Sequence, residues 1–378
     1  MTVDRFALPA VLSHSPTRVV FAPGALEQIG EIAAAEGAQR ALLVTDRGIV
    51  GAGYADRAQA ALRRAGVETV LFDGVEENPT TAHVEAGVQV AAALQVDFLI
   101  GLGGGSAMDC AKGVNFLFTN GGAMRDYWGV GKATRPMLPM IALPTTAGTG
   151  SEAQSFALIA DATTHQKMAC GDKKAACHVA ILDPDLTRTQ PARVASASAI
   201  DAVSHAIETA ATKAGNDVSR AFTREAWDRL DRSFEVAMRD ARDNHARADM
   251  LLGAHLAGAA IEQSMLGAAH ACANPLTRRF GVAHGVAVGV MLPHVIRFNA
   301  RHSGTSPYAI VEPDGDRLAA RVEQLLVVAR LPRRLTALDV PEDSLVELAE
   351  EAAKQWTASF NPVPVGLAEL LTIFRAAM

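Results

Sequence analysis

The chain reads I-G-L-G-G-G-S-A-M-D-C-A-K from Ile100 to Lys112, where a buried apolar strand runs into glycines and then opens a helix. Glycines let the backbone approach an anion closely, and the N-terminus of the following helix offers free N–H groups and the positive end of a dipole. The stretch therefore favours a pyrophosphate cradle. It is not the GxGxxG fingerprint, because Ser106 stands where the last glycine would be. The alternative is a glycine-rich turn needed only for packing.

The residues around this stretch alternate between strand and helix patterns. Apolar strands are expected at 18–21, 41–46, 68–73 and 96–101, with helices at 25–36, 55–65 and from about 82. Further strand-like segments lie at 140–143, 156–159 and 179–182. Strands that are apolar throughout and separated by helices predict βαβ units and a buried parallel sheet.

From about Ala192 the pattern changes to consecutive helices with almost no strand signal. Helices are expected at 198–213, 219–240, 246–273 and 342–356, and Pro275 is expected to end the third, with His270 near its end. A chain of 378 residues exceeds the size of one growing core. We therefore predict an α/β plus all-α protein, with a Rossmann-like parallel-sheet domain at 1–187 and a helical domain at 188–378.

The composition is typical of a globular protein, with 49% hydrophobic and 20% charged residues. A net charge of −6 argues against nucleic-acid or anionic-membrane partners. The four cysteines form no CxxC pattern, which favours reduced thiols in the cytoplasm. No leader-like segment and no apolar run of transmembrane length is found, so we expect a soluble cytoplasmic protein with no membrane contact.

Four side chains of the second half suit a metal ion. Asp201 and His205, in I-D-A-V-S-H-A-I-E, project from one helix face a turn apart, and His270 and His284 follow later. One Asp and three His suit Fe²⁺ or Zn²⁺ and can leave a position open for a substrate oxygen. The alternative is that these are packed core histidines, since a chain with 11 histidines offers many chance combinations.

A second polar loop, P-T-T-A-G-T-G-S-E, runs from Pro144 to Glu152 after another apolar strand. In an open α/β sheet, ligands bind at the carboxyl ends of strands. Asp46 also follows a strand, where it could accept hydrogen bonds from ribose hydroxyls and so favour NAD over NADP. The alternatives are a solvated turn for the loop and a helix cap for Asp46, and the neighbouring Arg47 weakens the preference for NAD.

These motifs, in this order and together with H-x13-H, resemble the iron-containing (group III) alcohol dehydrogenase family over nearly the whole chain. The resemblance implies a dehydroquinate synthase-like fold and Asp201, His205, His270 and His284 as catalytic metal ligands. It also implies dinucleotide contacts at Asp46, Asn78, Gly103, Gly104, Gly105, Ser106, Thr145, Thr146, Thr149, Leu158 and Lys167. Family positions for the substrate pocket are Phe156, Leu158, Ile261 and Met265. Asn274 replaces a histidine that many members carry four residues after the third ligand.

The implied activity is that of an NAD(H)-linked alcohol dehydrogenase or aldehyde reductase, with NADP(H) less favoured. Its substrate would be a small or medium alcohol or the matching carbonyl, with the oxygen on the metal during hydride transfer. Family habit suggests a homodimer or larger homo-oligomer. The alternatives are a metal-independent maleylacetate-reductase-like enzyme, a dehydroquinate-synthase-like enzyme, and a non-catalytic dinucleotide-binding or structural protein.

Overall fold

The computed structural model describes residues 6–378, and the chain divides into two compact units. An α/β unit runs to Thr146 and continues over Ser151–Gln190. A helical unit contains Ala147–Gly150 and Pro191–Met378. The predicted combination of a parallel α/β part and an all-helical part is confirmed.

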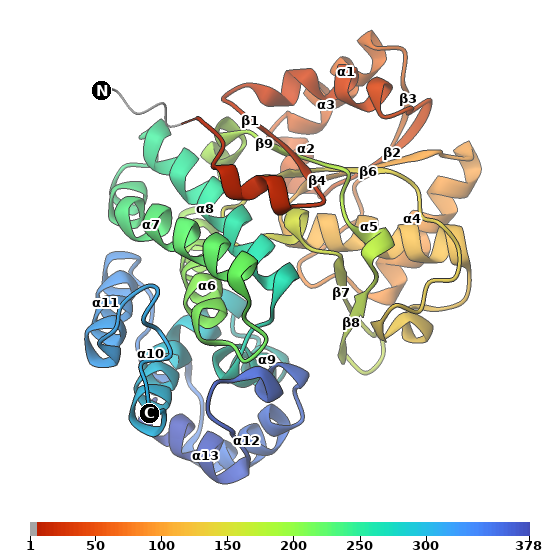
Figure 1. The fold of residues 1–378 in the computed structure, drawn as a ribbon. Coiled ribbons are helices and arrows are strands. Elements are labelled where there is room, and N and C mark those ends of the chain that lie inside the picture. Colours follow the sequence, from red (N-terminus) through yellow and green to blue (C-terminus); the bar gives the residue numbers. More distant parts are fainter. Residues whose placement is uncertain (1–5) are drawn as a thin grey trace. The chain divides into compact units, whose positions relative to one another are not determined.

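The α/β unit is built on a six-stranded parallel sheet (Figure 1). Its strands are β1 (Arg18–Phe21), β2 (Arg40–Val44), β3 (Glu68–Phe72), β4 (Phe98–Gly103), β6 (Met140–Pro144) and β9 (Val179–Leu182). They lie in the order β1-β9-β6-β4-β2-β3. Since β3 lies on one side of β2 and β4 on the other, the strand order reverses between β2 and β4. In open sheets of this kind, ligands bind beyond the carboxyl ends of the strands at that point.

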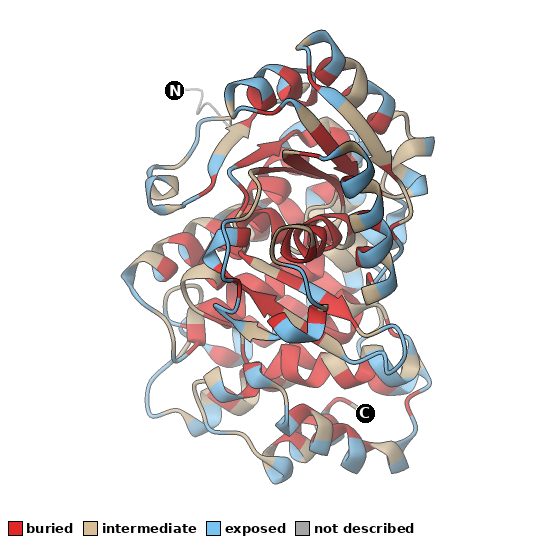
Figure 2. Cartoon of the chain, turned by 90° about the vertical axis from the view of Figure 1, so that its right-hand side faces the viewer, coloured by how far each residue is buried: buried red, intermediate tan, exposed pale blue. Residues whose placement is uncertain are grey.

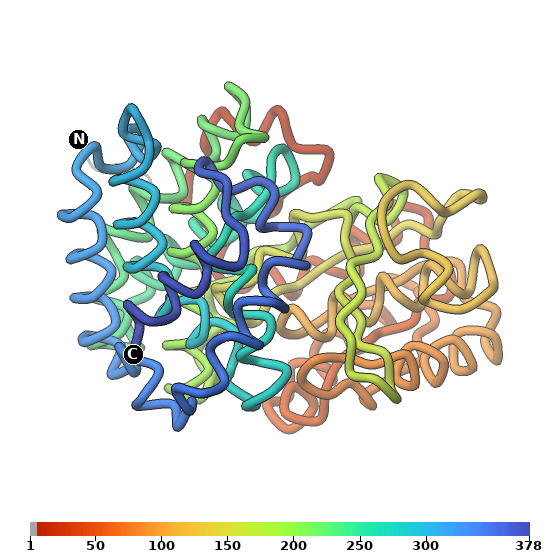
Figure 3. Tube along the Cα trace, turned by 90° about the horizontal axis from the view of Figure 1, so that it is seen from below, coloured from red at the N-terminus to blue at the C-terminus, as the bar shows by residue number. Residues whose placement is uncertain are grey.

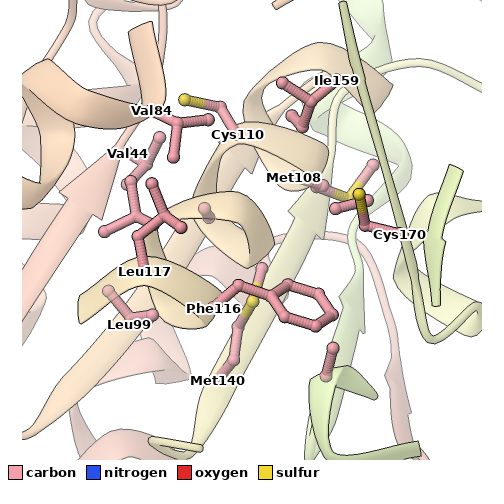
Figure 4. Close-up of a cluster of buried hydrophobic side chains, with 14 of the residues drawn as sticks. Val44, Val84, Leu99, Met108, Cys110, Phe116, Leu117, Met140, Ile159 and Cys170 are labelled. Carbon is pink, nitrogen blue, oxygen red and sulfur yellow. The ribbon is translucent and has the colours of Figure 1, made fainter. Parts of the chain in front are cut away.

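Helices cover both faces of this sheet, which explains why its strands are apolar at successive positions. On one face, Leu42 and Leu99 pack in a buried cluster with residues of α4 (Thr81–Leu94) and α5 (Gly105–Asn120), drawn in Figure 4. On the other face, Leu43 packs with residues of α1 (Ile29–Ala35) and α3 (Tyr54–Arg64). The inner strands β4, β6 and β9 are buried at every residue, as the red strands of Figure 2 illustrate, whereas the edge strands β1 and β3 are only partly buried.

A second, three-stranded sheet belongs to the same unit. It contains β5 (Gly129–Val130), β8 (Lys167–Gly171) and β7 (Phe156–Ala160), and β7 pairs with β8 antiparallel. The segment predicted at 156–159 is therefore a strand, but it does not join the parallel series. The reason is that only a short turn separates β7 from β8, which suits a hairpin rather than a crossover. Strand β8 was not predicted.

The helical unit is formed by eight α-helices of the described chain, seen as coils of the tube in Figure 3. They are α6 (Ala192–Ala211), α7 (Asp217–Arg239), α8 (Asn244–Gln263), α9 (Ala268–Phe280), α10 (His284–His302), α11 (Gly315–Val328), α12 (Leu345–Ala353) and α13 (Leu367–Ala376). Helix α10 packs against both α6 and α9. Among the residues that the structure describes, no helix is long and apolar enough to cross a membrane.

The prediction of one continuous helix over 246–273, ended by Pro275, is wrong. Helix α8 ends at Gln263, and α9 begins at Ala268 after a break in which Gly267 is not helical (φ −141°, ψ −146°). Pro275 lies inside α9. Its missing N–H removes one helical hydrogen bond without ending the helix. His270 is consequently the third residue of a new helix, where backbone N–H groups have no partner within the helix.

Candidate metal and dinucleotide sites

Asp201 and His205 lie one turn apart on α6, as their spacing predicts, and both are buried. One carboxylate oxygen of Asp201, Oδ1, lies 3.6 Å from Nε2 of His205. The same oxygen lies 3.6 Å from Nε2 of His270 on α9. The Asp201 carboxylate therefore lies between His205 on its own helix and His270 on a second helix.

His284 completes the cluster as the first residue of α10. Ligand atoms of Asp201, His270 and His284 all lie within 4.8 Å of one another. The ring of His205 stacks on that of His270 with centroids 4.9 Å apart, and the rings of His270 and His284 are 5.3 Å apart. The structure thus brings all four predicted ligands together from three helices.

A close contact between α6 and α10 places His284 in the cluster. A Cβ atom at Gly285 would lie only 2.0 Å from the backbone oxygen of Ala197 and 3.1 Å from Cβ of Asp201. Glycine is therefore required for the start of α10 to approach α6 this closely. In the His284-Gly285 pair, a predicted ligand is therefore followed by the glycine that lets it reach the cluster.

The charges of the cluster are strongly coupled. Burial alone would raise the pKa of the Asp201 carboxyl, but His205, His270 and His284 outweigh it and hold that pKa well below its usual range. Burial lowers the pKa of His205, partly opposed by Asp201. Burial would also lower the pKa of His270, yet Glu208 and Asp201 raise it to about 9. With a pKa of about 9, His270 holds an extra proton in the metal-free chain at neutral pH, so a cation that binds through this ring must displace that proton.

The donor set fits a divalent metal ion. Oδ1 of Asp201 and Nε2 of His270 are buried polar atoms that make no hydrogen bond within the described residues. Such atoms are costly unless something satisfies them. A carboxylate oxygen and three imidazoles are ligands that Fe²⁺ and Zn²⁺ accept. A cation held at this position would satisfy both atoms.

Glu208 also belongs to this cluster, and our sequence analysis did not single it out. It is buried on α6, three residues after His205, and its Oε2 lies 2.5 Å from Nδ1 of His270. Its Oε1 accepts a hydrogen bond of 2.7 Å from the backbone N–H of Ala269. The spacing to His205 placed Glu208 beside the predicted ligands on the helix, but only the fold shows its contact with α9.

The glycine loop and Asp46 meet at the point where the strand order reverses. Asp46 follows β2 and caps α2 (Arg47–Gly51), accepting a 3.0 Å hydrogen bond from Ile49 N–H. Asp46 is therefore a helix cap, which was the alternative to ribose binding. A Cβ atom at Gly103 (φ 153°) would lie 2.8 Å from Cβ of Ala107 and 3.5 Å from Oδ2 of Asp46. A side chain would therefore fill the space beside the turn, as expected for a phosphate cradle.

Thr145 and Thr146 also lie beside the glycine turn. A Cβ at Gly104 would lie 3.4 Å from the methyl group of Thr146, and Thr145 N–H donates to Gly103 O at 2.9 Å. Gly104 precedes α5 and provides no side-chain cap, so N–H groups in the first turn of α5 are open to an anion. Gly105 and Ser106 form that first turn.

The other predicted dinucleotide residues lie elsewhere on the two units. Asn78 is exposed with a left-handed backbone (φ 57°), and Leu158 and Lys167 lie on the β7–β8 hairpin. Thr149 is in the 147–150 segment of the helical unit.

Beneath the hairpin, the fully buried Lys112 ammonium donates to Ser151 O at 2.6 Å and to Phe156 O at 3.0 Å.

The predicted pocket residues are divided between the units. Ile261 and Met265 are buried near the end of α8, and Phe156 begins β7. Asn274, one turn after His270 on α9, donates a 3.0 Å hydrogen bond to Oε1 of Gln355. The amide that replaces the usual histidine is therefore held by a neighbour in the helical unit.

Comparisons with known proteins agree with this geometry. Residues 16–184 match the family described as iron-containing alcohol dehydrogenase, and residues 195–378 match the C-terminal part of that family. Alcohol dehydrogenase 4 of Schizosaccharomyces pombe is 33% identical over 98% of this chain and 90% of its own. The structure of a 1,3-propanediol oxidoreductase aligns at a TM-score of 0.92 and 33% identity, covering 96% of this chain and 98% of that one.

A third relative was solved with a cofactor. Sulfoacetaldehyde reductase from Bifidobacterium kashiwanohense, in complex with NAD⁺, aligns at a TM-score of 0.87 and 28% identity, covering 96% of this chain and 97% of that one. Both halves of our chain therefore match the same family, and the second half matches its C-terminal part. With its four predicted ligands clustered and its glycine turn in place, the chain belongs to the iron-containing alcohol dehydrogenase family and is an oxidoreductase of that type.

Proposed function

We propose that this chain is a metal-dependent, NAD(H)-linked alcohol dehydrogenase that also reduces the corresponding aldehyde. The observation that carries the proposal is the cluster formed by the buried Asp201, His205 and His270 with the half-buried His284. Hydride chemistry needs a nicotinamide as well, and the glycine turn beside Asp46 provides a site suited to a dinucleotide.

The chain's own residues have separate tasks in this proposal. Asp201 and the three histidines would hold a divalent ion, which would supply Lewis acidity toward a substrate oxygen. First-turn N–H groups of α5 would bind the pyrophosphate of NAD(H), and Asp46 would accept a hydrogen bond from a ribose hydroxyl. Asn274 cannot titrate near neutral pH, so it would form hydrogen bonds but would not transfer a proton during the reaction.

Similarity to a 1,3-propanediol oxidoreductase favours a small alcohol as substrate. The buried apolar side chains of Ile261 and Met265 suit a substrate without a charged tail. Four buried cysteines with free thiols suit the reducing cytoplasm, and we propose that location. A homodimer or larger assembly remains a prediction, which light scattering on the purified chain measures directly.

A metal-independent reductase on the same fold is the second candidate function. It would need no cluster of one carboxylate and three imidazoles, so the retained ligand set favours the metal enzyme. The presence of a glycine turn does not separate the two, because both would use a nicotinamide. Metal dependence is therefore the property to measure.

The test is metal content by elemental analysis, with NADH oxidation on an aldehyde panel before and after chelation. About one metal per chain is expected, with turnover lost on chelation and restored by Fe²⁺ or Zn²⁺. His270→Ala and His284→Ala should each abolish metal binding and turnover but retain NADH binding, measured by fluorescence titration. Full activity in a metal-depleted protein would replace this proposal with the metal-independent reductase.

A further inference from the structure

We propose that Glu208 is a positioning residue that fixes the orientation and the tautomer of the His270 ring, so that Nε2 of this ring faces the metal. The inference rests on the proposed metal function and adds a residue that does not itself contact the ion. It follows from the two hydrogen bonds of one buried carboxylate with adjacent residues of α9.

The contact with His270 determines which ring nitrogen is available. Nδ1 of His270 lies 2.5 Å from Oε2 of Glu208, while Nε2 faces Oδ1 of Asp201 at 3.6 Å. An ionised carboxylate can only accept hydrogen bonds, so Nδ1 must carry a proton in this pair. A neutral imidazole with its proton on Nδ1 has its lone pair on Nε2, which is the atom in the cluster.

The second contact holds the backbone that carries the ring. Helix α9 has Gly267 as its N-cap and receives no side-chain cap from it. Instead, Glu208 Oε1 accepts from Ala269 N–H at 2.7 Å, and Asn361 Oδ1 accepts from Ala268 N–H at 3.3 Å. A negative charge at a helix N-terminus is favoured by the helix dipole. One carboxylate therefore restrains both the first turn of α9 and the ring attached to it.

The space around these contacts is closely filled. A Cβ at Gly267 would lie 3.0 Å from Glu208 Oε1 and 3.2 Å from Asn361 Oδ1. Asn361 is held in turn by two hydrogen bonds with Asn299, at 3.0 and 2.7 Å. Glu208 is buried, so water does not readily take the place of its carboxylate oxygens as hydrogen-bond acceptors. The position of His270 is consequently built into the helical unit before any ion binds.

Glu208→Gln separates this role from mere packing, because glutamine has the same size but only one acceptor oxygen. Ala269 N–H and His270 Nδ1–H both need an acceptor, and an amide satisfies one of them. If the amide oxygen serves Ala269, its NH₂ group faces Nδ1 and favours the opposite tautomer, with the proton on Nε2. A ring in that state cannot offer Nε2 to a metal.

The matched control is Asn361→Ala. It removes the acceptor of Ala268 N–H at the same helix start but leaves the Glu208–His270 contact in place. Loosening of α9 alone would therefore appear in both variants, whereas a change in the His270 ring would appear only in Glu208→Gln. Thermal unfolding without metal checks that each variant folds.

The experiment measures Zn²⁺ affinity by competition with a chromophoric chelator in wild type, Glu208→Gln and Asn361→Ala. We expect Glu208→Gln to weaken Zn²⁺ binding by about 10–100-fold, the range found when an outer-shell partner of a ligand is lost. Asn361→Ala should bind Zn²⁺ nearly as the wild type does. Equal affinity in Glu208→Gln and wild type overturns the inference, and so does equal weakening in both variants. No Zn²⁺ binding by the wild type would instead reject the metal site itself.

A second measurement needs no variant of Glu208. In the zinc-loaded wild type, ¹⁵N-histidine NMR should show His270 with a proton on Nδ1 that exchanges slowly with water, assigned by its absence in His270→Gln. An unprotonated Nδ1 in the metal-loaded protein would overturn the inference even if Glu208→Gln failed to fold.

Discussion

Gly285→Ala should disturb the proposed metal site although residue 285 contributes none of its predicted ligand atoms. The added Cβ would lie 2.0 Å from the backbone oxygen of Ala197, and distances under 3.0 Å are essentially never seen for real Cβ atoms. The start of α10 must therefore move from α6 by about 1 Å, the difference between these two distances. Neither contacting group is a flexible side chain, so the movement cannot be absorbed locally.

The displacement carries His284, the residue immediately before Gly285, away from Asp201. Metal–ligand distances tolerate only about ±0.2 Å, so a movement of about 1 Å removes one ligand from its position. We expect at least about a tenfold loss of Zn²⁺ affinity, from the mutational range for groups that orient a metal ligand. Overpacking should also lower the free energy of unfolding by about 1–3 kcal/mol.

Gly289→Ala is the matched control on the same pair of helices. Its Cβ would lie 2.9 Å from Cγ1 of Ile200 and 3.1 Å from Cδ2 of Leu326, which are side-chain atoms that can turn away. The assays are chelator competition for Zn²⁺ and urea unfolding of both variants. Equal Zn²⁺ affinity in Gly285→Ala and wild type would refute the argument that this close approach sets the ligand position.

Two further predictions concern buried charge. Lys112→Met should lower the free energy of unfolding by about 3–5 kcal/mol, because it removes the cation that lies 3.9 Å from the buried Asp109 carboxylate and leaves only the effect of Lys167. Denaturant unfolding measures this free energy. Adding Asp109→Asn to Lys112→Met should recover part of the lost stability. A loss under about 1 kcal/mol in Lys112→Met would contradict a paired buried charge. Burial, with Arg297 nearby, lowers the pKa of His294 to about 4 from 6.5, so the unfolded chain binds the proton first as the pH falls. The free energy of unfolding should therefore fall by about 1–3 kcal/mol between pH 6.5 and pH 4, and this component should be absent in His294→Gln.

Much of the fold could be predicted because its causes are local in the sequence. Strands such as β2 and β4 are apolar at successive positions, since helices cover both faces of the sheet. Asp201 and His205 could be paired because their spacing is that of one helical turn. The β7–β8 hairpin could not be placed in this way, because an apolar segment such as 156–160 has the same pattern in either sheet.

The break between α8 and α9 was missed for a related reason, since residues 246–273 are rich in helix-forming Ala, Leu and Met. Yet this break is what allows the contacts of Glu208. In a continuous helix, the N–H of Ala269 would bond to the carbonyl of Met265 and would have no hydrogen bond left for a carboxylate. Starting a new helix at Ala268 leaves that N–H open in the first turn, directly beside His270. His270, which local propensity would place inside a long helix, therefore lies where Glu208 can hold both its ring and the backbone N–H of the preceding residue.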